Sequence, residues 1–145
     1  MNILNIVTSP RKEQSASTAV VNAFLSEYRA NVGDVTVDTL DIWQEQLPEF
    51  DAEAIGAKYK GISGESMTPF ETATWEKIRE LASRFQRADR IVMGVPMWNF
   101  SVPYKLKQLI DLSCQRNMLF TFDGKLYGPS LSIEIGRASC RERVS

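Results

Sequence analysis

Short apolar segments alternate with longer amphipathic segments along this chain. Asn2 to Val7 (NILNIV) is short and rich in branched residues, which predicts a buried strand. Val35 to Leu40 and Arg90 to Val95 predict two more strands, and the latter is apolar nearly throughout, as a central parallel strand is. A fourth strand is expected to begin within Leu126 to Glu134.

Helical spacing of apolar residues predicts helices over residues 17–32, 51–60, 69–88 and 103–112. The third begins at Thr68-Pro69-Phe70-Glu71, which has the pattern of a capping box, and Gly33 follows the first as a helix-ending glycine. The expected buried stripes are Val20, Val21, Phe24, Leu25 and Tyr28 on the first helix, Trp75, Ile78, Leu81, Ala82 and Phe85 on the third, and Leu106, Leu109 and Ile110 on the fourth.

This alternation of strands and helices predicts an α/β fold of three layers, with a doubly wound parallel sheet and helices on both faces. Ligands of such sheets bind beyond the carboxyl ends of the strands. The segments that follow the first and third strands are therefore the candidates for a binding site.

Composition agrees with one globular domain, because 145 residues with 43% hydrophobic and 24% charged residues can bury a core without a metal or disulfide. The longest apolar stretch, Ile91 to Trp98, is too short to span a bilayer. The N-terminus lacks the basic and apolar regions of a signal peptide, so a cytoplasmic location is expected.

Charge and residue types exclude several classes of function. A net charge of −1 gives no reason to expect a nucleic-acid or membrane partner. The chain has no histidine, which removes Ser-His-Asp hydrolysis and nearly every zinc site, and Cys114 and Cys140 do not form a CxxC motif. No metal site is expected, and the chemistry must come from carboxylates, hydroxyls or a cofactor.

Hydroxyl side chains are concentrated after the first strand, where residues 8–18 read TSPRKEQSAST. Hydroxyls and backbone N–H groups at a helix N-terminus suit a phosphate group. The alternative is that Ser15 or Ser17 only caps the helix. The chain has neither GxGxxG nor a P-loop, which argues against a Rossmann dinucleotide site and a P-loop NTPase.

Aromatic and amide side chains follow the third strand, where residues 94–103 read GVPMWNFSVP. Exposed Trp and Phe rings at a strand end would be covered by a flat aromatic ligand, and the Asn99 amide would meet its ring heteroatoms. The alternative is a loop that packs over its own core.

Together, TSPRKEQSAS and GVPMWNFSVPYKLKQLID resemble the FMN-dependent NADH:quinone oxidoreductase and azoreductase family, which has a flavodoxin-like fold. The resemblance covers residues 1–134. It implies that the phosphate and ribityl end of FMN is held by Ser9, Ser15, Ala16 and Ser17. It implies that the isoalloxazine is lined by Met97, Trp98, Asn99 and Phe100. Position Ala16 is more often polar in the family.

The family's complete sheet has five strands in the order 2-1-3-4-5, and here we expect the fourth to be partial and the fifth to be missing. Residues 135–145 read IGRASCRERVS, which resembles a translated sequencing adapter. We therefore expect an incomplete FMN-binding domain over 1–134 and a non-native tail over 135–145. Without that tail, 14 basic and 17 acidic residues remain, a net charge of −3.

The resemblance implies an enzyme in which NADH or NADPH reduces FMN by hydride transfer and a quinone or aromatic azo compound then takes the electrons. No side chain is expected to act as a catalytic acid or base, because the cofactor carries the chemistry. The complete form is expected to be a homodimer. Two alternatives remain, a flavodoxin-type electron carrier and a non-catalytic fragment; a net charge of only −3 argues against the carrier.

Overall fold

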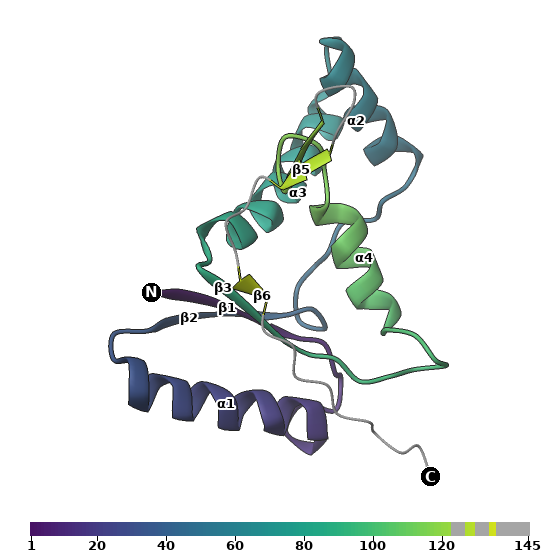
Figure 1. The fold of residues 1–145 in the computed structure, drawn as a ribbon. Helices are drawn as coiled ribbons and strands as arrows, with labels where there is room; N and C mark the ends of the chain where they lie inside the picture. The colour runs from purple at the N-terminus through teal and green to yellow at the C-terminus, as the bar shows by residue number, and fades with distance from the viewer. Residues whose placement is uncertain (123–126, 130–133, 136–145) are drawn as a thin grey trace. The chain divides into compact units, whose positions relative to one another are not determined.

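The computed structural model describes residues 1–122, 127–129 and 134–135 (Figure 1). The described chain divides into two compact units. The first contains residues 1–46, 87–107 and 134–135, and the second contains residues 47–86, 108–122 and 127–129. In the part of the chain that is described, no helix has both the length and the apolar character of a membrane span.

A parallel sheet forms the centre of the first unit. Its strands are β1 (Asn2–Val7), β2 (Thr36–Asp41), β3 (Arg90–Gly94) and β6 (Glu134–Ile135), in the order β2-β1-β3-β6. The predicted parallel sheet and the order 2-1-3 are therefore confirmed. On β1, Ile3 and Leu4 point to opposite faces and are both buried, as expected for a central strand that is covered on both sides.

The predicted partial fourth strand of the parallel sheet is confirmed, because β6 begins at Glu134, within the predicted range, and lies beside β3. Within Leu126 to Glu134, Tyr127–Pro129 forms β5, which pairs antiparallel with β4 (Phe120–Phe122). Glu134 pairs in parallel with Arg90 of β3, and Ile135 continues the strand beside Ile91. Pro129 offers no N–H to a ladder, which suits an edge position such as β5 better than a central strand.

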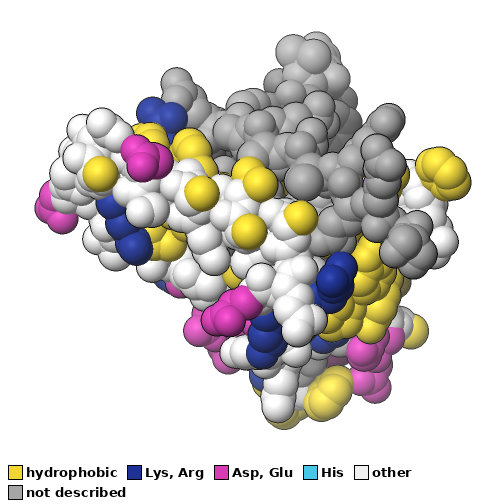
Figure 2. Space-filling model, turned by 90° about the horizontal axis from the view of Figure 1, so that it is seen from below, with side chains coloured by type: hydrophobic (Ala, Val, Ile, Leu, Met, Phe, Trp, Pro, Cys, Tyr) yellow, Lys and Arg dark blue, Asp and Glu magenta, His cyan; other side chains and the backbone are white. Residues whose placement is uncertain are grey.

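Helix α1 (Ala16–Val32) packs against the sheet through Val21 and Leu25, which form one buried cluster with Ile3 and Val92. The prediction that Val20 and Phe24 are also buried is wrong, because each is 43% exposed. Each lies one residue before a buried one, about 100° around the helix, and so flanks the sheet. Figure 2, viewed from the side of α1, shows hydrophobic side chains exposed on this face.

The second unit contains α2 (Ala52–Ser63) and most of α3 (Pro69–Arg87). The predicted capping box is confirmed, since Glu71 N donates to Thr68 Oγ1 at 3.2 Å and Thr68 N donates to a Glu71 carboxylate oxygen at 2.7 Å. The same carboxylate pairs with Lys60 of α2 at 2.8 Å. This ion pair and the Lys60 hydrogen bond join the two helices, and they lower the pKa of Glu71. The predicted α3 stripe is buried throughout.

Helix α4 (Tyr104–Ser113) begins in the first unit and ends in the second. Leu106, Leu109 and Leu112 are buried, but Ile110, which was predicted to point inward, is 40% exposed. Its neighbour Leu109 takes the inward position, since adjacent residues of a helix point about 100° apart.

Candidate functional site

The carboxyl ends of three neighbouring strands are tied together by two hydrogen bonds. Thr8, which follows β1, donates from Oγ1 to the Gly94 carbonyl at the end of β3 at 2.6 Å. Trp43, which follows β2, donates from its indole Nε1 to the Thr8 carbonyl at 2.9 Å. All three residues belong to the first compact unit. The segments predicted to bind a ligand after β1 and β3 therefore start from one fixed edge.

Hydroxyl side chains gather at the N-terminus of α1. Ser15 caps the helix and accepts from Thr18 N at 3.5 Å, and its Oγ lies 2.9 Å from Ser17 Oγ. Ser9 accepts from the Arg11 N–H at 3.3 Å. The three serine side chains are buried, and the Thr18 Oγ1 atom is buried without a hydrogen-bond partner among the described residues. Ser15 therefore caps the helix, as the alternative predicted, while Ser17 and Thr18 add hydroxyl groups that capping does not require.

After β3, the chain makes a two-residue turn at Asn99 and Phe100. Trp98 and Ser101 exchange both backbone hydrogen bonds, at 2.9 and 2.8 Å. Asn99 has φ +47° and Phe100 has φ +61°, so both residues are left-handed, as in a type I′ turn. Asn tolerates this conformation, but Phe does so at a cost of about 1–2 kcal/mol. The turn leaves the Phe100 side chain 96% exposed.

Trp43 contacts both the aromatic loop (residues 94–103) and the hydroxyl loop (residues 8–18). Its ring lies 5.8 Å from the Trp98 ring and 5.6 Å, edge to face, from the Tyr104 ring. The Lys105 ammonium lies 5.7 Å from the centre of the Trp43 ring. The same indole bonds the Thr8 carbonyl, so Trp43 contacts both segments. The sequence prediction missed this residue.

The structure places the predicted site residues at one sheet edge, but in different environments. Ser9, Ser15 and Ser17 are buried, whereas Ala16 is exposed. Trp98 is half-buried against Trp43, and the more exposed residues of the aromatic loop are Met97, Asn99 and Phe100. The exposure of Met97 and Phe100 does not agree with a loop that packs over its own core.

Comparison of the sequence with known proteins shows which family the chain matches. Residues 1–133 match the family described as having the flavodoxin-like fold. The chain is 59% identical over 133 residues to FMN-dependent NADH:quinone oxidoreductase 2 of Burkholderia lata, covering 92% of the chain and 64% of that protein. It is 45% identical over 125 residues to FMN-dependent NADH:quinone oxidoreductase 2 of Pseudomonas syringae pv. tomato, covering 86% of the chain and 60% of that protein.

A solved structure shows the same likeness. The crystal structure of an azoreductase from Bacillus anthracis superposes with a TM-score of 0.80 at 26% identity, over 88% of this chain and 62% of that one. The chain therefore spans less than two thirds of the length of these relatives. Both the sequence match and the parallel sheet with its 2-1-3 strand order lead to one conclusion: the chain belongs to the family of proteins with the flavodoxin-like fold.

Proposed function

We propose that this chain is the FMN-binding part of an NAD(P)H-dependent flavin oxidoreductase that reduces quinones and aromatic azo compounds. The observation that carries the proposal is the meeting of two segments at one sheet edge. The hydroxyl-lined N-terminus of α1 and the strained aromatic turn start from adjacent strands, and the Thr8–Gly94 hydrogen bond fixes one start against the other. The names of the two relatives, both FMN-dependent NADH:quinone oxidoreductases, support the choice of cofactor and reaction.

The residues at the N-terminus of α1 fit a phosphate group. Ser9, Ser15 and Ser17 present hydroxyls there, and the buried Thr18 Oγ1 has no partner in the described chain, although a buried hydroxyl normally has one. The dipole of a 17-residue helix favours an anion at this end. Ala16 would contribute only its backbone. We assign the phosphate and ribityl end of FMN to Ser9, Ser15, Ala16 and Ser17.

The aromatic loop fits a flat ring system. Met97 and Phe100 present apolar surface, Trp98 is braced by Trp43, and Asn99 presents an amide. We assign the isoalloxazine to Met97, Trp98, Asn99 and Phe100. FMN held by these residues would supply the redox chemistry, hydride transfer from NADH or NADPH and electron transfer to an acceptor, while the residues themselves bind and orient the ring.

The proposal includes the partners and the assembly of the complete protein. NADH or NADPH is the electron donor, a quinone or azo compound is the acceptor, the complete form is a homodimer, and its location is the cytoplasm. Sedimentation equilibrium of the complete protein, with and without FMN, measures its oligomeric state. A monomer in both states would contradict the proposed homodimer.

The test compares the chain with a chimera in which residues 1–133 replace the matching segment of the B. lata relative. Flavin released on denaturation is identified by chromatography, and NADH oxidation is followed with 1,4-benzoquinone or methyl red. We expect FMN in the chimera and NADH oxidation that requires an acceptor. Absence of FMN from both proteins would overturn the proposal. Flavin that exchanges electrons only with a redox protein would indicate a flavodoxin-type carrier. Turnover in the chimera but not in the 145-residue chain would indicate that the chain is a non-catalytic fragment, and FMN without turnover in the chimera would overturn the proposed reaction.

Two substitutions test the assignment of the aromatic loop. Asn99→Gly keeps the left-handed turn and removes the amide, and should weaken FMN binding by about 1–3 kcal/mol. Trp98→Ala should weaken it by loss of apolar contact. Asn117→Gly is the matched control, because Asn117 is also left-handed, at φ +62°, and lies in the second unit. Wild-type FMN affinity in both Asn99→Gly and Trp98→Ala would refute the assignment.

A further inference from the structure

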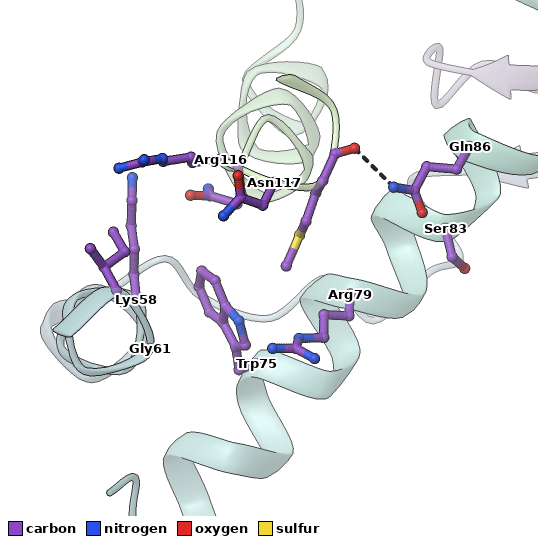
Figure 3. Close-up of a pocket in the computed structure, with 11 residues that line it drawn as sticks. Lys58, Gly61, Trp75, Arg79, Ser83, Gln86, Arg116 and Asn117 are labelled. Atoms are coloured by element: carbon purple, nitrogen blue, oxygen red, sulfur yellow. Dashed lines mark hydrogen bonds between the residues drawn. The ribbon is translucent and has the colours of Figure 1, made fainter. Parts of the chain in front are cut away.

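All the described residues that line a cavity of about 580 Å³ belong to the second compact unit, and none of them is assigned above to FMN. Figure 3 shows that its walls come from α2, from α3 and from the segment that follows α4. Its volume is within the range of pockets that bind small molecules. The proposed function makes no use of it.

Three cationic side chains line this cavity, one from each wall. Lys58 comes from α2, Arg79 from α3 and Arg116 from the segment after α4 (Figure 3). Arg116 donates to the Phe122 carbonyl at 2.9 Å. None of the described lining residues is acidic, and among the described residues none of the three cations has an ion pair. Like charges around one concave site repel one another, and an anion bound between them relieves that repulsion.

The uncharged part of the wall suits a flat ring. Trp75 is 8% exposed, and its indole stands in the space between Lys58, Arg79 and the segment after α4 (Figure 3). Met118 also lines the cavity, and its carbonyl accepts a hydrogen bond from Gln86 Nε2 at 2.8 Å. An indole and a thioether offer polarizable apolar contact to an aromatic ring.

A buried amide adds a polar group to the lining. Gln115 is 2% exposed and donates from Nε2 to the Asp111 carbonyl at 2.6 Å. Its Oε1 atom has no hydrogen-bond partner among the described residues. Buried amide oxygens normally accept a hydrogen bond, so this acceptor suits a ligand that carries a hydroxyl or amino group besides its acid.

From these observations we propose that the cavity of the second unit binds a small aromatic acid, a flat ring system that carries a carboxylate. The ring packs on Trp75 and Met118, and the positive charges of Lys58, Arg79 and Arg116 around it favour the carboxylate. The described lining of the cavity shares no residue with the proposed FMN site, so the two proposals are tested independently.

The test uses the 145-residue chain labelled with 5-fluorotryptophan and titrated with 2-naphthoate. The chain has three tryptophans, and single Trp→Phe variants assign their fluorine resonances. We expect a saturable shift of the Trp75 resonance while the Trp43 and Trp98 resonances stay in place. Neutral 2-naphthol, which keeps the rings and loses the carboxylate, should bind about tenfold more weakly or worse. A hydroxyl added in 6-hydroxy-2-naphthoate should raise the affinity, because Gln115 Oε1 accepts a hydrogen bond from it.

Substitutions identify the cations involved. Arg79→Gln and Lys58→Gln should each weaken 2-naphthoate binding by about tenfold. Lys77→Gln is the matched control, because Lys77 is exposed on the same helix as Arg79 and does not line the cavity. Dispersed fluorine resonances in every variant show that it remains folded. Three results would overturn the proposal: no shift at Trp75, equal affinity for 2-naphthoate and 2-naphthol, or an equal effect of Arg79→Gln and Lys77→Gln.

Discussion

Gly94, at the end of β3, lies beside Thr8, which follows β1, and beside the first turn of α1. Replacing it by alanine tests how tightly these three parts of the candidate site are packed. A Cβ added there would lie 2.8 Å from the Ser17 carbonyl oxygen and 3.1 Å from both the Ser17 carbonyl carbon and Val21 Cγ2. Two of these atoms are backbone in the first turn of α1, so no side-chain rotation makes room. Either α1 moves away from β3 or the end of β3 moves, and the Thr8–Gly94 hydrogen bond moves with it.

The expected cost follows from the size of the clash. Forcing a methyl group into a close-packed interface costs typically 1–3 kcal/mol, and we expect about 2 kcal/mol for Gly94→Ala. For a chain of this length, that corresponds to a fall of roughly 7 °C in melting temperature. Because the displaced elements carry the hydroxyl loop and the aromatic loop, FMN affinity should fall as well.

Gly56→Ala makes the same chemical change with the opposite expected sign. Gly56 lies inside α2, and a Cβ there would meet only Glu71 Oε1 at 3.6 Å, an ordinary contact. Alanine in a helix interior is favoured over glycine by about 0.5–1 kcal/mol, so this variant should be stabilised. Fluorine resonances of 5-fluorotryptophan at Trp43 and Trp98 report urea unfolding of the first unit, and that at Trp75 reports the second. An unchanged or raised first-unit midpoint in Gly94→Ala would refute the packing argument.

Three further outcomes are expected. Trp43→Phe keeps an aromatic ring but removes the donor to the Thr8 carbonyl. The free energy of unfolding measured in urea should fall by about 1–2 kcal/mol, and FMN should bind more weakly. Wild-type stability and FMN affinity would show that this hydrogen bond does not contribute to either. The lowered pKa of Glu71 means that its ionised form stabilises the fold above the ordinary carboxyl pKa, and that this contribution is lost as pH falls through the lowered value. The difference in melting temperature between wild type and Glu71→Gln should therefore be largest near neutral pH and shrink as the pH is lowered below the ordinary carboxyl range, whereas a constant difference would contradict this. Burial raises the pKa of the Cys114 thiol, so iodoacetamide at about pH 8 should modify it more slowly than free cysteine, as followed by peptide mass spectrometry; an equal rate would exclude the shift.

Local signals in the sequence predicted the elements whose cause is local. The capping box at Thr68 and Glu71 forms as expected, because all its partners lie within four residues. β1 begins and ends where the apolar run does, and α1 starts after the serine that caps it. The parallel direction of the strands followed from the alternation of strands and helices, whereas their order was implied by the resemblance to the family.

Features that depend on distant partners were not predictable in this way. Trp43 follows β2 as a single aromatic residue, and its role depends on Thr8, 35 positions away, and on Trp98. The exposure of Val20 and Phe24 depends on which line of α1 faces Ile3 and Val92, while helical periodicity alone groups them with Val21 and Leu25. The antiparallel pairing of Tyr127–Pro129 with Phe120–Phe122 depends on strand partners that apolar content does not specify.

The turn at Asn99 and Phe100 shows how the site and the fold make different demands on the same residues. A type I′ turn normally carries Asn followed by Gly, and glycine at position 100 would remove most of the strain of the left-handed backbone. The chain instead holds a phenylalanine there, 96% exposed, between two backbone hydrogen bonds. Neither backbone strain nor an exposed apolar ring stabilises the free chain. Both are explained if the ring serves a bound partner, and the carboxyl edge of the sheet, where Thr8 and Trp43 fix the neighbouring strands, is the place where a flat cofactor would use it.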